Sequence, residues 1–324
     1  MSSTEESALS GQRSPLAGAD GASRRSPLTI GTALVAITKP RIIELLLVTT
    51  VPTMILAAGG WPPLGVALAV IVGGTLAAAG ANTFNSVYDR DIDAVMPRTR
   101  HRPVPSGLLS ARAGVAWGLV LSAASIAVLA VFTNVLAAAL ALAAIAFYVL
   151  GYTMWLKRRT PQNIVWGGAA GCMPVLIAWA AVTGTLTWTP LVLFLVIFLW
   201  TPPHYWPLSL RYREEYASAG VPMLPVVADA PRVAGQIVLY GWAMVIASLL
   251  LVPVAPMGWA YAVAAVVLGA VFLIEAYRLR SRVLRGDDDV RPMRLFHWSI
   301  SYLALLFLAV ALDPFLSGLG GPYA

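Results

Sequence analysis

Long apolar runs separated by short polar stretches repeat along the chain from residue 42 to residue 312. A run of about 18 or more such residues is typical of a helix that spans a bilayer. The pattern therefore predicts nine spanning helices in one bundle, with no inserted soluble domain. The predicted segments are Ile42–Ala58, Leu64–Phe84, Ala113–Phe132, Leu136–Trp155, Ile164–Val182, Leu191–Tyr205, Gln236–Val254, Trp259–Tyr277 and Leu295–Leu312.

The sixth predicted helix differs from the others because it is short and runs into Thr201-Pro202-Pro203. Proline removes a backbone donor and its ring crowds the preceding turn, so we expect this helix to break or tilt near its end.

Composition agrees with a lipid surrounding. Of the 324 residues, 59% are hydrophobic and 11% are charged, whereas a soluble domain carries about 25% charged residues. The mean hydropathy is +0.77. We expect an all-α membrane protein that uses the lipid bilayer as its solvent and has no nucleic-acid partner.

The beginning of the chain has another character, since residues 1–37 are rich in Ser, Gly and Ala and lack the apolar core of a secretory signal. We predict a disordered cytoplasmic tail there and a single transmembrane domain over residues 38–324. The one cysteine, Cys172, excludes an internal disulfide and is expected to be a small packing residue.

Basic residues indicate the orientation. All 22 Lys and Arg precede the first predicted helix or lie in the connections after the second, fourth, sixth and eighth. Basic loops stay in the cytoplasm. The pattern predicts a cytoplasmic N-terminus, an outside C-terminus and an odd number of spans.

The clearest candidate for chemistry lies at the end of the second predicted helix, where Asn85, Asp89 and Asp93 are spaced four residues apart. Residues at that spacing are neighbours on one helix face. Two carboxylates and an amide oxygen suit Mg²⁺, which is usually held by one or two carboxylates together with substrate phosphates. Asp91 is expected to point elsewhere and to be solvated. The alternative is that these acids only mark the water interface.

The loop that follows contains three prolines in eleven residues and carries Arg98 and Arg102 beside the predicted metal site. Arginine matches phosphate oxygens in a bidentate way, which favours both residues as diphosphate contacts. The second cytoplasmic loop runs from Lys157 and Arg158 to Asn163, and by the same argument its basic residues are candidates for diphosphate contacts. For any single basic residue, a purely topological role is the alternative.

A third loop combines aromatic, basic and acidic residues. His204 is flanked by Pro203 and Tyr205, and both a ligand role and a structural role stay open for it. Further along, Glu214 and Glu215 are candidates for a second metal. Glu44, in the first predicted helix, is an intramembrane carboxylate with either a functional role or an ion pair to Lys39 or Arg41.

These motifs resemble those of the UbiA-type intramembrane prenyltransferases. The family's Asn-x3-Asp-x3-Asp motif is matched by Asn85, Asp89 and Asp93. The haem-specific branch of the family adds four further motifs. The matching runs in this chain are Arg98–Gly107, Lys157–Asn163, Thr201–Trp206 and Ala219–Pro225. The chain departs from the branch at Glu215-Tyr216, where the branch usually has Asp-Tyr.

The resemblance implies transfer of a farnesyl group from farnesyl diphosphate to the vinyl group of haem B, with Mg²⁺ as cofactor. It implies a site on the cytoplasmic side of the plasma membrane, with haem A synthase as a candidate downstream partner. The expected catalytic residues are Asn85, Asp89, Asp93, Arg98, Arg102, Lys157 and Arg158, the first three also as metal ligands. The expected substrate-binding residues are Asn163, His204, Tyr205, Arg213, Glu215 and Tyr216.

Two other functions stay open at this point. One is a prenyltransferase of the same family that acts on an aromatic quinone precursor, because the Asp motif is shared with such enzymes. The other is a transporter, which nine spans with intramembrane charge would suit. Polar residues that crowd one membrane face, instead of the midplane, disfavour the transporter.

Overall fold

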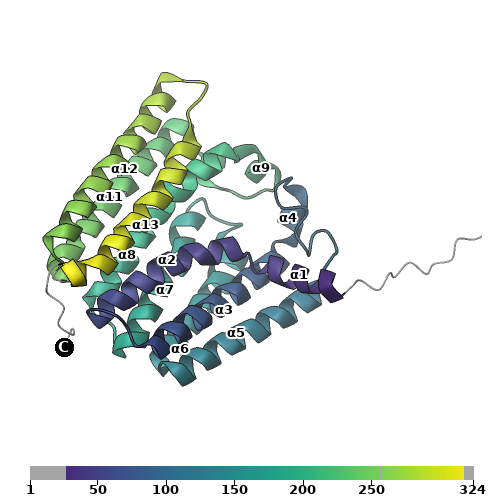
Figure 1. Ribbon diagram of the computed structural model, residues 1–324. Coiled ribbons are helices and arrows are strands. Elements are labelled where there is room, and N and C mark those ends of the chain that lie inside the picture. The colour runs from purple at the N-terminus through teal and green to yellow at the C-terminus, as the bar shows by residue number, and fades with distance from the viewer. Residues whose placement is uncertain (1–26, 256, 317–324) are drawn as a thin grey trace, which may run out of the picture.

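The computed structural model describes residues 27–255 and 257–316, and within these residues all regular elements are helices (Figure 1). All nine predicted apolar segments are helical. The corresponding helices are α2 (Pro40–Ala58), α3 (Leu64–Tyr88), α5 (Ala111–Phe132), α6 (Val135–Ala146) continued by the π-helix η1 (Phe147–Leu156), α7 (Asn163–Thr183), α8 (Trp188–Arg211), α11 (Ala230–Val254), α12 (Trp259–Arg285) and α13 (Pro292–Leu316).

In the described part of the chain, eight of these helices, with α6 and η1 counted as one, are long and apolar enough to cross a membrane. Helix α2 is not among the eight: within the residues whose side chains the structure describes, its apolar stretch is Leu46–Ala58. The chain is therefore a helical membrane protein with eight candidate spans, and the predicted count of nine is not confirmed.

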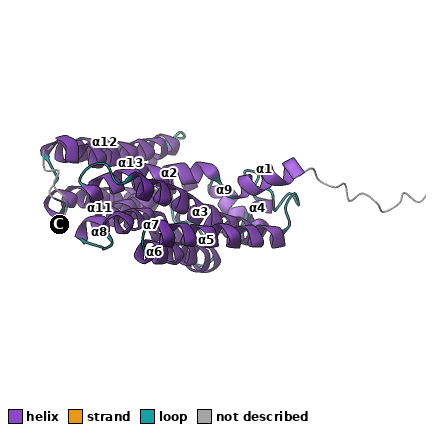
Figure 2. Ribbon diagram, turned by 60° about the horizontal axis from the view of Figure 1, so that its bottom comes forward, coloured by secondary structure: helices purple, strands orange, loops and turns teal. Residues whose placement is uncertain are grey.

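Four short helices complete the described chain: α1 (Pro27–Ile37), α4 (Arg90–Val95), α9 (Arg213–Ser218) and α10 (Leu224–Val227). In both views α1, α4 and α9 gather at the end of the bundle opposite the C-terminus (Figures 1 and 2).

The prediction of a disordered tail over residues 1–37 is wrong for residues 27–37, which form α1. Its segment is apolar, and Ile37 packs in a cluster with Val87, Val104 and Leu109. Burial of these apolar side chains stabilises α1. Residues 1–26 lie outside the described part of the chain.

The sixth predicted helix does not break at its prolines. Helix α8 continues through Pro202, Pro203 and Pro207 to Arg211. In membrane helices, neighbouring helices and hydroxyl side chains can satisfy the backbone groups that proline frees. Here Pro202, Pro203 and Pro207 are buried in the bundle, and the Thr201 hydroxyl donates to the Ile197 carbonyl at 2.9 Å.

Close approach of α3 and α5 depends on small residues. A Cβ added at Gly80 would lie 2.5 Å from the Ser122 hydroxyl and 3.1 Å from the Gly118 carbonyl, so a larger residue would separate the two helices. The Ser125 hydroxyl donates to the Gly73 carbonyl at 2.6 Å across the same contact. Small residues and interhelical hydrogen bonds are how helices associate where lipid offers little hydrophobic driving force.

Candidate active site

A cavity of about 450 Å³ lies between the ends of α2, α3, η1, α7, α8 and α13, with α4 and its following loop at its edge. Ligand pockets usually have volumes of roughly 300–1,000 Å³. One part of the wall is charged and another is aromatic. The charged part consists of Lys39, Asp93, Arg98, Arg102 and Lys157, and the aromatic part consists of Tyr148, Tyr152, Trp200, His204, Tyr205, Tyr216 and Phe296.

Asn85, Asp89 and Asp93 form a ladder across the junction of α3 and α4. The backbone keeps α-helical spacing there, because Asp89 N donates to Asn85 O at 2.9 Å and Asp93 N donates to Asp89 O at 2.8 Å. All three side chains are buried, and the Asn85 amide donates to Asp89 Oδ2 at 2.7 Å. The shared face predicted from the spacing is therefore present.

Each member of the ladder has its own cationic partner. Lys39 Nζ donates to Asn85 Oδ1 at 2.6 Å, and Lys157 Nζ donates to Asp89 Oδ2 at 2.5 Å. Arg102 Nη1 contacts both oxygens of Asp93, at 2.8 and 2.9 Å. Burying a carboxylate costs free energy unless it is paired, so these cations are what allow the acids to sit inside the protein.

Lys39 is a site residue that the sequence did not single out. It precedes α2 with a left-handed backbone, φ 56°, which a residue other than glycine seldom adopts. Burial and the nearby Arg102 and Lys157 lower the pKa of Lys39 to about 7. Such backbone strain clusters at functional sites. The sequence feature that could have indicated Lys39 as a site residue is its position directly before Pro40, at the start of a helix.

The ion pair between Glu44 and Lys39, one of the alternatives for Glu44, is not formed. Lys39 instead contacts Asn85, and the Glu44 side chain is exposed on α2. The other partner considered for Glu44 was Arg41, whose side chain lies outside the described part of the chain.

Arg158 supports the ladder from outside the cavity. Its guanidinium contacts both oxygens of Asp91 at 2.7 Å, lies over the Tyr88 ring at 4.8 Å, and approaches Asp89 Oδ1 to 3.5 Å. The hydrogen bond from Arg158 lowers the pKa of Asp91 to about 2. Asp91 does point away from the ladder and is exposed, as predicted, but it forms this ion pair as well as facing solvent.

A second cluster holds Arg98 at the cavity edge. Arg98 Nη2 donates to the Tyr216 hydroxyl at 3.3 Å, and that hydroxyl lies 2.9 Å from the Tyr205 hydroxyl. The Arg98 Nε is 3.8 Å from Glu215 Oε2. Glu215 therefore contacts an arginine instead of facing the ladder.

The remaining predicted residues lie away from the cavity. Arg213 and Glu214 are exposed on α9. Asn163 is fully buried at the start of α7, where its amide donates to the Lys157 carbonyl at 3.4 Å. Asn163 thus contacts the backbone of a cavity residue without lining the cavity.

Helix η1 supplies two aromatic residues that the sequence did not predict as site residues. In a π-helix the hydrogen bonds run to the fifth residue back, as in Lys157 N to Tyr152 O at 2.9 Å. This winding brings Tyr148 and Tyr152 to the cavity wall and leads into Lys157. Such π-segments occur often at functional sites, but apolar periodicity gives no signal for them.

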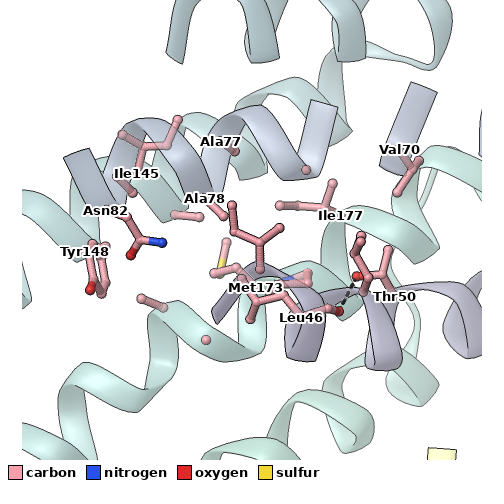
Figure 3. A pocket seen from close by; sticks show the side chains of 18 residues that line it. Leu46, Thr50, Val70, Ala77, Ala78, Asn82, Ile145, Tyr148, Met173 and Ile177 are labelled. Carbon is pink, nitrogen blue, oxygen red and sulfur yellow. Dashed lines mark hydrogen bonds between the residues drawn. The ribbon is translucent and has the colours of Figure 1, made fainter. Parts of the chain in front are cut away.

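A second, apolar pocket of about 140 Å³ lies beside the cavity (Figure 3). It is formed by α2, α3, α6, η1 and α7, with Asn82 and Tyr148 at one end and Thr50 and Val70 at the other. Leu46, Tyr148 and Gly171 line both spaces, so the pocket extends the cavity into the apolar part of the bundle.

The ladder fits a divalent cation of the Mg²⁺ type. Its donors are carboxylate and amide oxygens, which Mg²⁺ prefers. Asp89 Oδ1 is buried and accepts no hydrogen bond, and so keeps a lone pair available. Within residues 27–255 and 257–316 no group of three or more His, Cys, Asp and Glu gathers, so a cation here would need further oxygens from a bound substrate.

Comparisons with known proteins agree on one group. The model of the UbiA prenyltransferase family matches residues 46–300. A protoheme IX farnesyltransferase from Clavibacter michiganensis subsp. michiganensis is 60% identical over 284 residues, which are 88% of this chain and 92% of that protein. One from a Nocardioides species is 56% identical over 310 residues, 95% of this chain and 99% of the relative.

Solved structures share the fold. A structure of digeranylgeranylglyceryl phosphate synthase has a TM-score of 0.72 at 17% identity, covering 89% of this chain and 99% of the other. A UbiA homolog from Archaeoglobus fulgidus bound to DMAPP and Mg²⁺ has a TM-score of 0.61 at 18% identity, with 86% and 99% covered.

The pairing of Lys157 with Asp89 predicts a change in cation affinity. Replacing Lys157 with Gln frees the carboxylate and removes a repelling charge, so the affinity of the purified protein for Mn²⁺ should rise about tenfold. Arg159→Gln, which removes an exposed charge from the same loop, is the matched control and should change affinity less than about twofold. Titration followed by electron paramagnetic resonance measures both. Equal affinities in the two variants would contradict the pairing.

Proposed function

Because the chain belongs to the UbiA prenyltransferase family, we propose that it transfers a farnesyl group from farnesyl diphosphate to a vinyl group of haem B, giving haem O. The observation that carries this proposal is the high identity, over nearly the whole chain, to relatives named protoheme IX farnesyltransferase. The cavity supports it, since a charged wall and an aromatic wall face one space.

The charged wall is assigned to the diphosphate. Asp89 and Asp93, with Asn85, would hold Mg²⁺, which acts as a Lewis acid on departing phosphate oxygens. The Archaeoglobus relative, whose structure contains DMAPP and Mg²⁺, supports a metal of this kind. Arg98, outside the ladder, would bind phosphate oxygens at the cavity edge.

Three cations change partners when the substrate arrives. Lys39, Arg102 and Lys157 contact the ladder in the structure. A divalent cation on the same carboxylates would leave them free to turn to the diphosphate, whose oxygens accept charge-assisted hydrogen bonds. These residues thereby stabilise the negative charge that develops as the allylic carbon–oxygen bond breaks.

The farnesyl chain is assigned to the apolar pocket, which shares Leu46, Tyr148 and Gly171 with the cavity (Figure 3). An isoprenoid chain there would be removed from water by the small side chains of α3, among them Ala77 and Ala78. Its reactive carbon would then lie where the pocket opens into the cavity.

The acceptor is assigned to the aromatic wall around Trp200, His204 and Phe296. The allylic carbon forms a bond with the vinyl group while the diphosphate leaves with its electron pair. The former vinyl group is left with a cation, which captures water and releases a proton, so that the product carries a hydroxyl group. Aromatic faces stabilise nearby cations, and Tyr148 and Tyr152 offer such faces.

For the membrane we propose nine crossings, with α2 as the ninth, a cytoplasmic N-terminus and an outside C-terminus. The clustering of α1, α4 and α9 at one end of the bundle supports a cytoplasmic site there (Figures 1 and 2). We also propose a plasma-membrane location, with haem A synthase as the downstream partner.

The acceptor can be tested directly. Membranes containing the protein, supplied with farnesyl diphosphate and haem B, should yield a product whose mass exceeds that of haem by one farnesyl unit plus water, measured by mass spectrometry. Replacing haem with hydroxybenzoate should give no prenylated product. If hydroxybenzoate were prenylated and haem were not, the acceptor would instead be an aromatic quinone precursor.

The metal ladder can be tested with two neighbouring acids. Asp89→Asn removes a buried charge and should lower turnover at least about 100-fold. Asp91→Asn removes an exposed carboxylate two residues away and should keep turnover within about fivefold, since Arg158 retains its contacts with Tyr88 and Asp89. Both are measured as initial rates over a range of Mg²⁺ concentrations. An Asp89→Asn enzyme with most of its activity would refute the ladder as the metal site.

The orientation can be tested by labelling introduced cysteines in a Cys172→Ser background. Thr185→Cys, between α7 and α8, should react with a membrane-impermeant maleimide in intact cells. Asp288→Cys, between α12 and α13, should react only after the membrane is opened. The reverse result would put the cavity on the outer side.

A further inference from the structure

The imidazole of His204 is held on three sides. Trp200 stacks on it at a centroid distance of 4.1 Å and an interplanar angle of 13°, and Phe296 does so at 4.7 Å and 24°. Two rings at these separations cannot share one face, so the imidazole lies between them. Its Nδ1 is 2.6 Å from the Ser299 hydroxyl.

The hydrogen count at Ser299 fixes the tautomer. The Ser299 hydroxyl has one proton, which it donates to the Phe296 carbonyl at 2.6 Å. It can therefore only accept from His204, and Nδ1 must carry the imidazole proton. Ser299 is fully buried, and its own carbonyl accepts from Trp200 Nε1 at 2.9 Å, so one residue fixes both rings.

The remaining ring nitrogen is the one that can meet a ligand. Nε2 has no hydrogen-bond partner among the described residues, and His204 lines the cavity. With both faces and the Nδ1 edge occupied, the free edge of the imidazole carries Nε2. In this tautomer Nε2 has a lone pair and no proton.

We propose that His204 Nε2 is an axial ligand of the iron in the porphyrin acceptor, and that Ser299 is the positioning residue that keeps its lone pair available. This inference rests on the proposed function, because it takes haem as the acceptor. A neutral imidazole without a proton on Nε2 cannot donate to a propionate, so its chemistry favours the iron. Ligating histidines almost always donate their other ring N–H to a neighbouring group, as His204 does here.

Ligand binding by His204 gives the site a way to select its acceptor. A bond from iron to a residue on α8 anchors the centre of the macrocycle, which leaves its vinyl edge to reach the allylic carbon. A porphyrin without iron would keep its apolar contacts with Trp200 and Phe296 and would lose this anchor.

The test is spectroscopic titration of the purified, detergent-solubilised full chain with ferric haem and, separately, with metal-free protoporphyrin IX. The unaltered protein should show the absorption and paramagnetic resonance of histidine-ligated iron. His204→Ala should lose this signature and regain it with added imidazole. His297→Ala, an exposed histidine on α13 outside this cavity, is the control and should bind both porphyrins normally.

Ser299→Ala separates positioning from simple packing. It should weaken haem binding about tenfold and leave protoporphyrin IX affinity within about twofold, while Ser299→Thr, which keeps the hydroxyl, should restore haem binding. Equal loss for both porphyrins, or an intact histidine signature in His204→Ala, would overturn the inference. Farnesyl transfer to haem, measured on the same preparations, separates a failure of the ligand assignment from a failure of the proposed reaction. Haem turnover without histidine ligation would contradict only the assignment of His204 as the iron ligand. Histidine ligation without haem turnover would contradict only the proposed reaction.

Discussion

The site depends on the compensation of buried acids by buried bases at the junction of α3 and α4. Asp89 and Asp93 are 1% and 3% exposed, which would be costly without the contacts from Lys157 and Arg102. The same contacts hold both carboxylates in place at one end of the bundle. The charged side chains are therefore in place before a metal diphosphate binds. Binding would only have to change which of these side chains are paired with one another.

The rest of the fold serves to bring these charges to one place. Helix α3 supplies the ladder, the π-helix η1 delivers Lys157, and the strained residue before α2 delivers Lys39. Helices α8 and α13 close the opposite side, joined by the contacts of Ser299 with Trp200 and His204. Positions far apart in the sequence thus meet because helix ends, where polar groups are tolerated, lie at the same end of the bundle.

Much of the architecture could be predicted from the sequence, because apolar runs in a membrane protein correspond directly to helices. All nine segments are helical, and the spacing of Asn85, Asp89 and Asp93 predicted a shared face that the structure has. Prolines suggested a break in α8 that tertiary packing prevents. Tyr148 and Tyr152 were missed because a π-helix leaves no periodic signal, and Lys39 because its partner Asn85 is 46 residues away.

The exposed Glu44 on α2 has a consequence for the surrounding lipid. Helix α2 (Pro40–Ala58) rises about 28 Å at 1.5 Å per residue, close to the thickness of about 30 Å of the hydrocarbon layer. In the proposed arrangement with α2 as the ninth crossing, the Glu44 carboxyl group would lie at the margin of that layer and draw water inward. An amphiphile arriving from the membrane at this hydrated margin could keep its head in water while its tail stays in hydrocarbon.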